Sequence, residues 1–244
     1  MQTWREWLGV ELSEVSLKEK LISTLGGIAS IWILITLGRW GLDGLGRHFV
    51  VGSMGATAVL LFAVPHGQLS QPWPVIAGHG FSALIGVLCA GWIPIPELAA
   101  AAAVGLAIGT MHQLKCIHPP GGATALTAVI GGPMIRELGF GFIVWPILIN
   151  ALWMVLLAIL LNAAFRWRRY PAKWVRPKAA QPTAPTPQEP THEEIVHALK
   201  SLDSFVDITE DDLLRLCQIL SRRQTSQTSR KQPTDSRPNI HCTR

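Results

Sequence analysis

The sequence predicts an all-α integral membrane protein, because its charges avoid one long central region. Only seven Lys, Arg, Asp and Glu residues fall between Leu21 and Phe165, although the whole chain has 21 basic and 16 acidic residues. Average soluble domains are about 25% charged, so this region lacks the polar groups that would cover a surface in water. It also divides into six apolar segments, which favours helices that cross a bilayer.

The six segments differ in length. Their approximate ranges are 21–38, 49–64, 75–95, 98–111, 122–135 and 138–165. A straight crossing takes about 20 residues, and the second, fourth and fifth segments are shorter than that. We therefore expect short, broken helices, whose backbone ends must face protein or a water-filled cavity rather than lipid.

The rest of the chain adds shorter parts on both sides of this region. The predicted parts are 1–20, an amphipathic N-terminal helix; 21–170, the transmembrane domain; 171–190, a Pro-rich linker; 191–223, a small cytoplasmic pair of helices; and 224–244, a disordered tail. Trp4, Trp7 and Leu8 stand at helical spacing among charges, which predicts a helix on the membrane surface. A frayed terminus is the alternative.

The basic residues predict that both termini lie in the cytoplasm. With six crossings and the N-terminus inside, ten Lys and Arg residues fall on the inner side and three on the outer side, as the positive-inside rule requires. The inner set is Arg5, Lys18, Lys20, Lys115, Arg166, Arg168, Arg169, Lys173, Arg176 and Lys178, and the outer set is Arg39, Arg47 and Arg136. A re-entrant short segment would require a new count.

Two of the apolar segments contain the same tetrapeptide. Gly55-Ala56-Thr57-Ala58 stands in the second segment and Gly122-Ala123-Thr124-Ala125 in the fifth. These segments hold equivalent places in two sets of three, and three crossings per set invert the second set relative to the first. Such a 3+3 inverted repeat is typical of transporters with a binding site near the bilayer midplane. The alternative is that the glycines and threonines only permit close helix packing.

The second tetrapeptide follows a sequence that predicts a helix start within an apolar run. His118-Pro119-Pro120-Gly121 precedes it, and prolines force the residue before them out of the α region. Unpaired N–H groups and the positive end of the helix dipole attract anions at such a start. Two starts that enter from opposite faces therefore predict an anion site. The candidate substrate-binding residues are Gly52, Ser53, Gly55, Thr57, His118, Pro119, Pro120, Gly121, Gly122 and Thr124.

Three further polar residues are candidates for accessory roles. His79, between Gly78 and Gly80, is either a proton carrier, because imidazole titrates near neutral pH, or a neutral side chain bonded to a carbonyl. Lys115 either attracts anions at the cytoplasmic mouth or snorkels to the interface. Asn150 either lines the pore or hydrogen-bonds between helices.

The sequence offers little support for catalysis or metal binding. It contains no Ser-His-Asp arrangement, paired carboxylates or phosphate loop. His112, Cys116 and His118 have a spacing that suits a soft metal, but the helix is expected to end before His118 and no acidic fourth ligand is nearby. We therefore predict that the protein is not an enzyme and has no cofactor or metal.

The run from His118 to Leu126 resembles the signature of the HPP family of integral membrane proteins. Residues 52–62, with Gln71-Pro72 and Gly78-His79, are similar to other blocks of that family, and the resemblance spans roughly residues 20 to 170. It implies a small transporter, with plastid and cyanobacterial relatives associated with nitrite movement. It also implies a bacterial plasma membrane, as in cyanobacteria, or a plastid-type membrane.

We therefore expect transport of a small inorganic anion, with nitrite as the first candidate. Nitrite is a planar monoanion that needs hydrogen-bond donors but no buried permanent cation, which would trap it. The alternative is a membrane-anchored sensor or regulatory protein that acts through the helices of 191–223. The expected partners are the anion, the lipid bilayer, a second copy of the chain and a cytoplasmic regulator at 191–223, with no nucleic acid.

Overall fold

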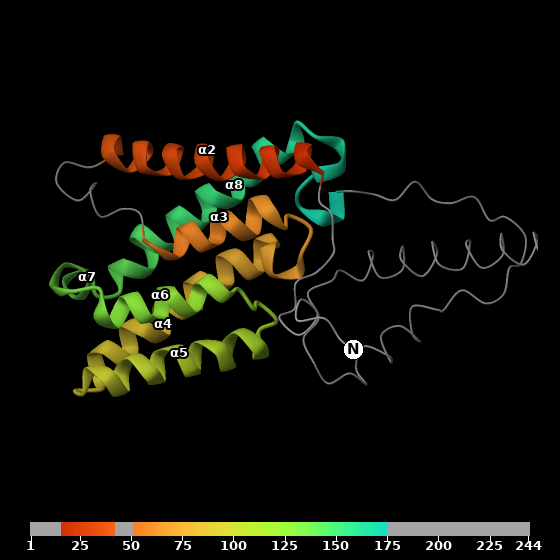
Figure 1. Cartoon of the computed structure of the whole chain (residues 1–244). Helices are drawn as coiled ribbons and strands as arrows, with labels where there is room; N and C mark the ends of the chain where they lie inside the picture. Colours follow the sequence, from red (N-terminus) through yellow and green to blue (C-terminus); the bar gives the residue numbers. More distant parts are fainter. Residues whose placement is uncertain (1–15, 42–50, 175–244) are drawn as a thin grey trace, which may run out of the picture. The chain divides into compact units, whose positions relative to one another are not determined.

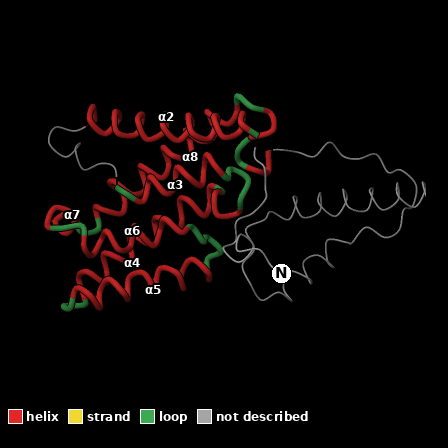
Figure 2. Tube along the Cα trace, viewed as in Figure 1, coloured by secondary structure: helices red, strands yellow, loops and turns green. Residues whose placement is uncertain are grey.

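The computed structural model describes residues 16–41 and 51–174, and all regular structure in these two ranges is helical (Figure 2). The main helices are α2 (Leu17–Gly41), α3 (Ser53–Ala63), α4 (Pro72–Trp92), α5 (Pro96–Gln113), α6 (Pro119–Ile130) and α8 (Ile149–Ala163). The shorter elements are η2 (Gln68–Ser70), α7 (Pro133–Leu138), η3 (Ile143–Leu148), η4 (Arg166–Arg168) and η5 (Ala172–Trp174). The main helices lie side by side and reverse direction from one to the next (Figure 1).

The chain divides into two units, Met1–Arg176 and Pro177–Arg244. The second unit lies outside the described residues, as do residues 1–15. The predictions for the linker beyond Trp174, the helices of 191–223 and the tail of 224–244 therefore fall outside the described residues. The predicted N-terminal helix is also outside, except that Leu17–Lys20 form the first turn of α2.

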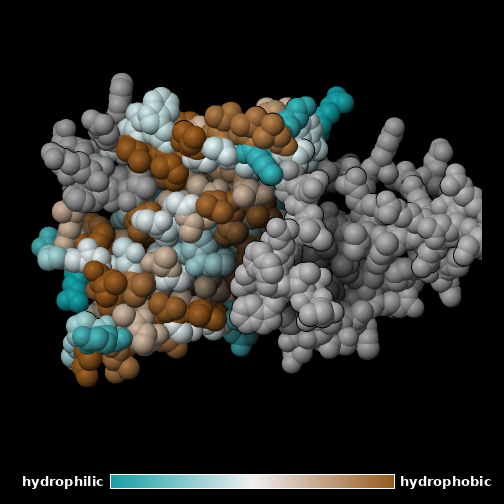
Figure 3. Space-filling view, in the orientation of Figure 1, coloured by the Kyte–Doolittle hydropathy of each residue, from teal (hydrophilic) through white to brown (hydrophobic). Residues whose placement is uncertain are grey.

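Within residues 16–41 and 51–174, three helices are long and apolar enough to cross a membrane: Leu17–Gly38, Pro72–Trp92 and Ile143–Ala163. Large hydrophobic side chains such as Trp32 and Leu160 are exposed on them. Figure 3 shows hydrophobic residues over much of the visible face and hydrophilic residues mainly near its two ends. This pattern confirms the prediction of an all-α membrane protein, because only lipid gives such a surface a favourable environment.

Helices α3 and α6 are short, as the segment lengths predict. They contain 11 and 12 residues, and at 1.5 Å per residue they measure about 16 to 18 Å, well below the roughly 30 Å of bilayer hydrocarbon. Helix α5, the fourth segment, has 18 residues, because Pro96 starts it earlier than the apolar pattern suggests. It is longer than the predicted range of 98–111 but still shorter than a straight crossing of about 20 residues.

The predicted boundaries of the fifth segment, 122–135, are wrong. Helix α6 begins at Pro119, with His118 extended before it at φ −141° and ψ 98°, since proline suits the first helical position and excludes the α region for its predecessor. After Ile130 the chain turns at Gly132, where φ is 93°. A positive φ of this size favours glycine, so α6 and α7 are separate helices.

Glycines bring α4 and α6 close together. A Cβ atom at Gly86 would lie 2.6 Å from the carbonyl oxygen of Ala125, and one at Gly121 would lie 2.7 Å from Ser82 Oγ. Real Cβ atoms do not approach other atoms so closely, so side chains at these positions would push the helices apart. For Gly121 the structure therefore gives a packing role, as small residues have in membranes.

A buried arginine joins the ends of three helices. Arg168 is 1% exposed; its Nη2 donates to the carbonyl oxygen of Phe62 at 2.6 Å, and its Nε donates to Asn162 Oδ1 at 3.1 Å. Its Nη1 pairs with the carboxylate of Glu19 in the first turn of α2. The start of α2 therefore meets the chain that follows α8, so both ends of the domain lie on one side.

Arg168, which the prediction counts among the inner charges, is thus buried at that end of the domain rather than exposed there. Desolvation lowers the pKa of the Arg168 guanidinium, and the nearby Glu19 carboxylate opposes that shift. Arginine remains charged in proteins, so the pair acts as an internal salt bridge. Among its neighbours, Trp167 stays half exposed, whereas Tyr170 is buried and donates to the carbonyl oxygen of Ser70 at 2.8 Å.

Candidate functional site

The first turns of α3 and α6 meet inside the domain. The two helices run in opposite directions (Figure 1). Ser53 Oγ lies 2.9 Å from Thr124 Oγ1, and Thr57 Oγ1 lies 3.1 Å from His118 Nε2. The start of each helix therefore contacts the other helix within its first two turns, and the threonines of both tetrapeptides reach the crossing.

His79 of α4 joins the two threonines. Its Nε2 lies 2.8 Å from Thr57 Oγ1, and its Nδ1 lies 2.8 Å from Thr124 Oγ1. The two copies of the repeated tetrapeptide thus place equivalent hydroxyl groups on opposite nitrogens of one imidazole. His79 is completely buried, so these threonines are its polar surroundings on both sides of the ring.

His118 completes the site. Its ring centroid lies 4.8 Å from that of His79, with an angle of 68° between the rings, and its Nδ1 lies 2.8 Å from the carbonyl oxygen of Leu69 in η2. We name the following five residues the polar cluster: Ser53, Thr57, His79, His118 and Thr124. All of them are buried, and none is more than 2% exposed.

The carbonyl group of Leu69 determines the tautomer of His118. A carbonyl oxygen only accepts hydrogen bonds, so His118 Nδ1 must carry the proton and donate it. In a neutral imidazole the other nitrogen, Nε2, is then an acceptor. Thr57 holds the hydroxyl that contacts this nitrogen, so the Thr57 hydroxyl donates to His118.

The same reasoning extends to His79. Thr124 Oγ1 donates to Ser53 Oγ at 2.9 Å, so its oxygen accepts from His79 Nδ1. In a neutral ring His79 Nε2 then has a lone pair, and it lies 2.8 Å from Thr57 Oγ1. The Thr57 hydroxyl therefore lies between the Nε2 atoms of both imidazoles, and it also contacts the carbonyl oxygen of Ser53 at 3.1 Å.

The polar cluster carries no fixed charge. Among residues 16–41 and 51–174, no carboxylate, Lys or Arg side chain hydrogen-bonds to it, and the ion pair of this part of the chain, Arg168 with Glu19, joins the helix ends described above. Neutral imidazoles and hydroxyls therefore form a polar, uncharged site inside the membrane domain. Such a site offers hydrogen-bond donors without a permanent cation.

The other predicted residues lie around the cluster rather than in it. Gly52 and Pro119 are exposed, Pro120 and Asn150 are buried, and Gly122 is half buried with open space where a Cβ would be. Lys115 is exposed and follows α5 in a left-handed conformation, with φ 52°. Gly55 lines a mainly apolar hollow of about 470 Å³ between α2 and α3, away from the imidazoles.

The backbone N–H groups at the helix starts differ from the prediction. Pro119 and Pro120 have no N–H, and the N–H of Gly121 donates to the carbonyl oxygen of His118 at 2.8 Å. In α3, the N–H of Gly55 donates to the carbonyl oxygen of Gly52 at 3.1 Å. The donors at the crossing are therefore hydroxyl and imidazole groups rather than unpaired backbone amides.

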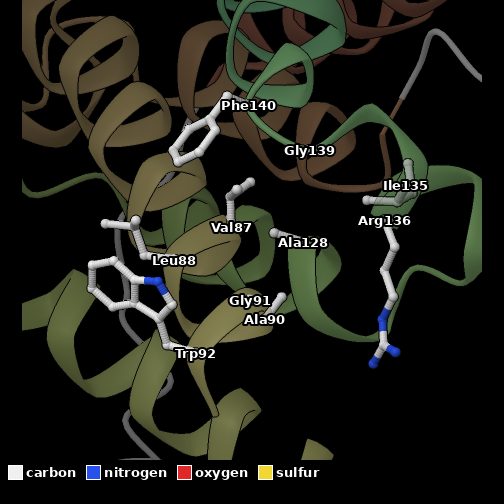
Figure 4. Close-up of a pocket in the computed structure, with 10 residues that line it drawn as sticks. All are labelled: Val87, Leu88, Ala90, Gly91, Trp92, Ala128, Ile135, Arg136, Gly139 and Phe140. Carbon is white, nitrogen blue, oxygen red and sulfur yellow. The ribbon is translucent and has the colours of Figure 1, made fainter. Parts of the chain in front are cut away.

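A cavity of about 290 Å³ lies further along α4 and α6. Trp92, Arg136 and Phe140 are among the residues that line it, with the aromatic rings and the arginine on different sides of the view (Figure 4). Val87, another lining residue, stands eight positions after His79, about 12 Å along the helix. The close contact of Gly86 with Ala125 falls between this cavity and the cluster.

Sequence reasoning missed two of these features. The sequence places Arg136 only among the outer charges, although this residue lines the cavity. The Gly86 contact gives no motif, because glycine is common throughout the chain. His79 and Gly86 are seven residues apart, which is two turns of a helix, so they lie on the same face of α4. This spacing is the signal that could have placed the Gly86 contact on the helix face that carries His79.

Comparison with known proteins identifies the family. Residues 12–171 match the profile of the HPP family described as its transmembrane region. Two transmembrane proteins of Dictyostelium discoideum are 37% identical to the chain over 180 and 183 residues, 71% of the chain in each case. The chain spans 58% and 64% of the length of these two relatives. No solved structure matches the chain. The protein belongs to the HPP family of integral membrane proteins.

Proposed function

We propose that the protein transports a small inorganic anion across the membrane through the polar cluster, with nitrite as the first substrate to test. One observation carries this proposal: two oppositely directed helix starts meet at a buried, uncharged group of hydroxyl and imidazole groups. A purely structural core of this set of helices needs no such group, because apolar residues pack there at lower cost.

The chemistry of the cluster favours a small anion. An anion that leaves water must find hydrogen-bond donors in place of its hydration shell. The hydroxyls of Thr57 and Thr124 and the N–H groups of both imidazoles are such donors, once they exchange their present partners for the anion. The absence of a fixed cation favours release, and the close packing of Gly86 and Gly121 favours a substrate of few atoms.

Two positively charged residues lie at opposite ends of the proposed path of the anion. Lys115 precedes the start of α6 and Arg136 follows its end, so they stand at opposite ends of this helix. Both are exposed, and exposed cations raise the local concentration of anions. We propose that the cavity beside Arg136 is the outer vestibule and that Lys115 lies at the cytoplasmic mouth.

Movement through the cluster requires the helices to rearrange, because the close contact of Gly86 with Ala125 separates it from the cavity. We propose that α2 to α4 and α5 to α8 form the two halves of a 3+3 inverted repeat that rock against each other. The antiparallel contact of α3 with α6 supports this arrangement. A second copy of the chain and the lipid bilayer are the other partners that we propose.

Nitrite uptake by proteoliposomes tests the proposal. The purified full-length chain is reconstituted, an inward nitrite gradient is applied, and trapped nitrite is measured colorimetrically after external nitrite is removed. We expect uptake well above that of protein-free vesicles, reduced by excess nitrate or formate if these anions share the site. The anion should be recovered chemically intact, as for a transporter rather than an enzyme.

Uptake equal to that of protein-free vesicles would contradict the proposal. It would favour the alternative of a membrane-anchored sensor that acts through the helices of 191–223. Those helices lie outside the described residues, and no contact among the described residues favours a sensor over a transporter.

A further inference from the structure

We propose that Thr57 relays a proton between His79 and His118, so that the anion crosses the membrane together with a proton. This inference rests on the proposed function, and it names the proton as the ion whose movement is coupled to that of the anion. It goes beyond a single titrating histidine, because it assigns the coupling to two imidazoles and to the hydroxyl that joins them.

The geometry that carries the inference is a continuous chain of hydrogen bonds. The chain runs through Ser53, Thr124, His79, Thr57 and His118 to the carbonyl oxygen of Leu69, with distances of 2.9, 2.8, 2.8, 3.1 and 2.8 Å. His118 donates to Leu69 and Thr57 donates to His118, whereas Thr124 donates to Ser53 at the other end. A proton added at His79 Nε2 therefore completes a series of donors from His79 through Thr57 and His118 to Leu69, and a proton passes along such a series.

Thr57 occupies the decisive position. Its single oxygen contacts Nε2 of both imidazoles, so this oxygen lies between the two ring nitrogens that would exchange the proton. Two structural histidines would each need a partner, but they would not need the same one. The shared hydroxyl is what makes a path between the rings.

The transfer balances atom by atom. When His79 is an imidazolium, its Nε2–H bond breaks and that proton bonds to a lone pair of Thr57 Oγ1. At the same time the O–H bond of Thr57 breaks, and its proton bonds to the lone pair of His118 Nε2. Each bonding pair stays on the atom that loses the proton, so nothing is oxidised or reduced. His79 and Thr57 end neutral, and His118 is now the imidazolium.

Water at the two membrane faces supplies and accepts the proton. His79 receives it through the Ser53 and Thr124 hydroxyls after both hydroxyls turn from their present directions and the ring takes its other tautomer, and His118 releases it from Nδ1 at the Leu69 end. Leu69 itself is partly exposed in η2, which places this end of the chain one residue from solvent. The hydroxyls and tautomers must then turn over before another proton can follow.

No other titratable side chain near the cluster takes part in the hydrogen-bond chain among the described residues, so the two imidazoles are the proposed proton carriers. On α3 to α6 and the connections between them, the other titratable side chains among the described residues are His66, Cys89, Glu97, His112, Lys115 and Cys116. Cys116 is buried behind Gly78, Glu97, His112 and Lys115 are exposed, and His66 contacts the carbonyl oxygen of Arg169. None of the six joins the hydrogen-bond chain.

Coupling follows from the cost of burying charge. A lone anion at the cluster would be an unpaired charge in a medium of low dielectric constant. A nearby negative charge favours the protonated form of an imidazole, so the anion draws a proton into the chain and the pair is neutral overall. An electroneutral pair crosses with less loss of solvation than the anion alone.

The ratio of protons to anions tests the relay. The full-length chain is reconstituted in vesicles that contain a pH-sensitive dye, the membrane potential is clamped at zero, and nitrite uptake and luminal acidification are recorded together. Protein-free vesicles correct for passive entry of nitrous acid. For the native chain we expect about one proton per nitrite, and for Thr57→Val a ratio at least about tenfold lower, because valine cannot relay a proton.

Two control variants make the test specific. Thr57→Ser keeps the hydroxyl and should restore the ratio. Thr127→Val removes the same group from α6, but Thr127 lies outside the cluster and bonds only to the carbonyl oxygen of Ala123, at 2.7 Å, so the ratio should stay unchanged. Should Thr57→Val fail to fold, His118→Gln takes its place, because glutamine keeps hydrogen-bonding capacity but cannot titrate.

The outcomes separate the relay from the transport proposal. Nitrite uptake by the native chain without proton entry overturns the relay and leaves transport standing. A folded Thr57→Val or His118→Gln chain with the native ratio also overturns it. Absence of nitrite uptake by the native chain overturns the proposed function itself.

Discussion

At the scale of single residues, the repeated tetrapeptide has a geometric meaning. Its two threonines, Thr57 and Thr124, occupy opposite nitrogens of the His79 ring. One copy alone would leave one nitrogen of this buried imidazole without its hydroxyl partner. The second histidine, His118, owes its position to the prolines that follow it, because they hold it in an extended conformation before α6.

Two adjacent glycines provide a matched test of the packing that holds the site together. A Cβ at Gly121 would lie 2.7 Å from Ser82 Oγ and 2.9 Å from the carbonyl oxygen of Gly78, whereas one at Gly122 would meet nothing within 4 Å. We expect Gly121→Ala to lower the free energy of unfolding by about 1–3 kcal/mol, as overpacking does. Gly122→Ala should be neutral or slightly stabilising, because alanine favours helix.

Thermal unfolding of both variants in the same detergent, followed by tryptophan fluorescence, checks this prediction. The midpoint of Gly121→Ala should fall below that of the native chain and that of Gly122→Ala. Equal midpoints for the two variants would mean that α4 and α6 are not in close contact at Gly121.

At the scale of elements, the short helix α3 depends on a polar cap. Its last carbonyl groups lie at the end of a helix that is shorter than the bilayer core, where unpaired carbonyls are costly. Arg168 caps this end by donating to the carbonyl oxygen of Phe62, and Asn162 Nδ2 donates to that of Leu61 at 3.4 Å. The chain after α8 thus stabilises the end of α3.

Arg168→Met tests this cap. Methionine has a similar length but no donors, so Glu19, Asn162 and the Phe62 carbonyl group all lose a partner. Removal of one partner from a buried pair costs about 3–5 kcal/mol, and we expect a clear fall in the midpoint of thermal unfolding. The control is Arg166→Met, at an exposed position two residues earlier, which should change stability by less than about 0.5 kcal/mol. A similar midpoint for both variants would show that the buried contacts of Arg168 contribute little.

The helices also show which parts of the fold could be predicted from the sequence. The apolar segments and their short members follow from composition and length, and the tetrapeptide alone points to Thr57 and Thr124. The predicted fifth segment crosses the break between α6 and α7, although Gly131-Gly132-Pro133 is a turn signal, because the prediction joins the apolar residues on both sides of it into one segment. The burial of Arg168 does not follow from the sequence, since it lies in a basic stretch typical of the interface, and only the fold brings it to Phe62.

At the scale of the whole molecule, the contact between Glu19 and Arg168 fixes the two ends of the domain on one side. The orientation of that side remains a prediction from the positive-inside rule. In a background without native cysteines, an Arg136→Cys chain should react with a membrane-impermeant maleimide added to intact cells. A Trp174→Cys chain should react only after the membrane is permeabilised. Reaction of Trp174→Cys in intact cells would place the termini outside.

The central claim is that the anion crosses at the polar cluster, and a matched pair of threonine variants tests it most directly. Thr124 and Thr127 stand one turn apart on α6, and both hydroxyls contact the carbonyl four residues earlier. Only Thr124 also contacts His79. Nitrite uptake is measured in proteoliposomes that hold equal amounts of the full-length native chain, Thr124→Val or Thr127→Val, after each shows the native size profile in detergent.

We predict that Thr124→Val lowers the initial rate of uptake at least about tenfold, because loss of a hydrogen bond to a charged group costs about 1.5–3 kcal/mol. Thr127→Val should transport at close to the native rate. A correctly folded Thr124→Val chain that takes up nitrite as fast as the native chain and the Thr127→Val chain would contradict the claim that the anion passes through this cluster.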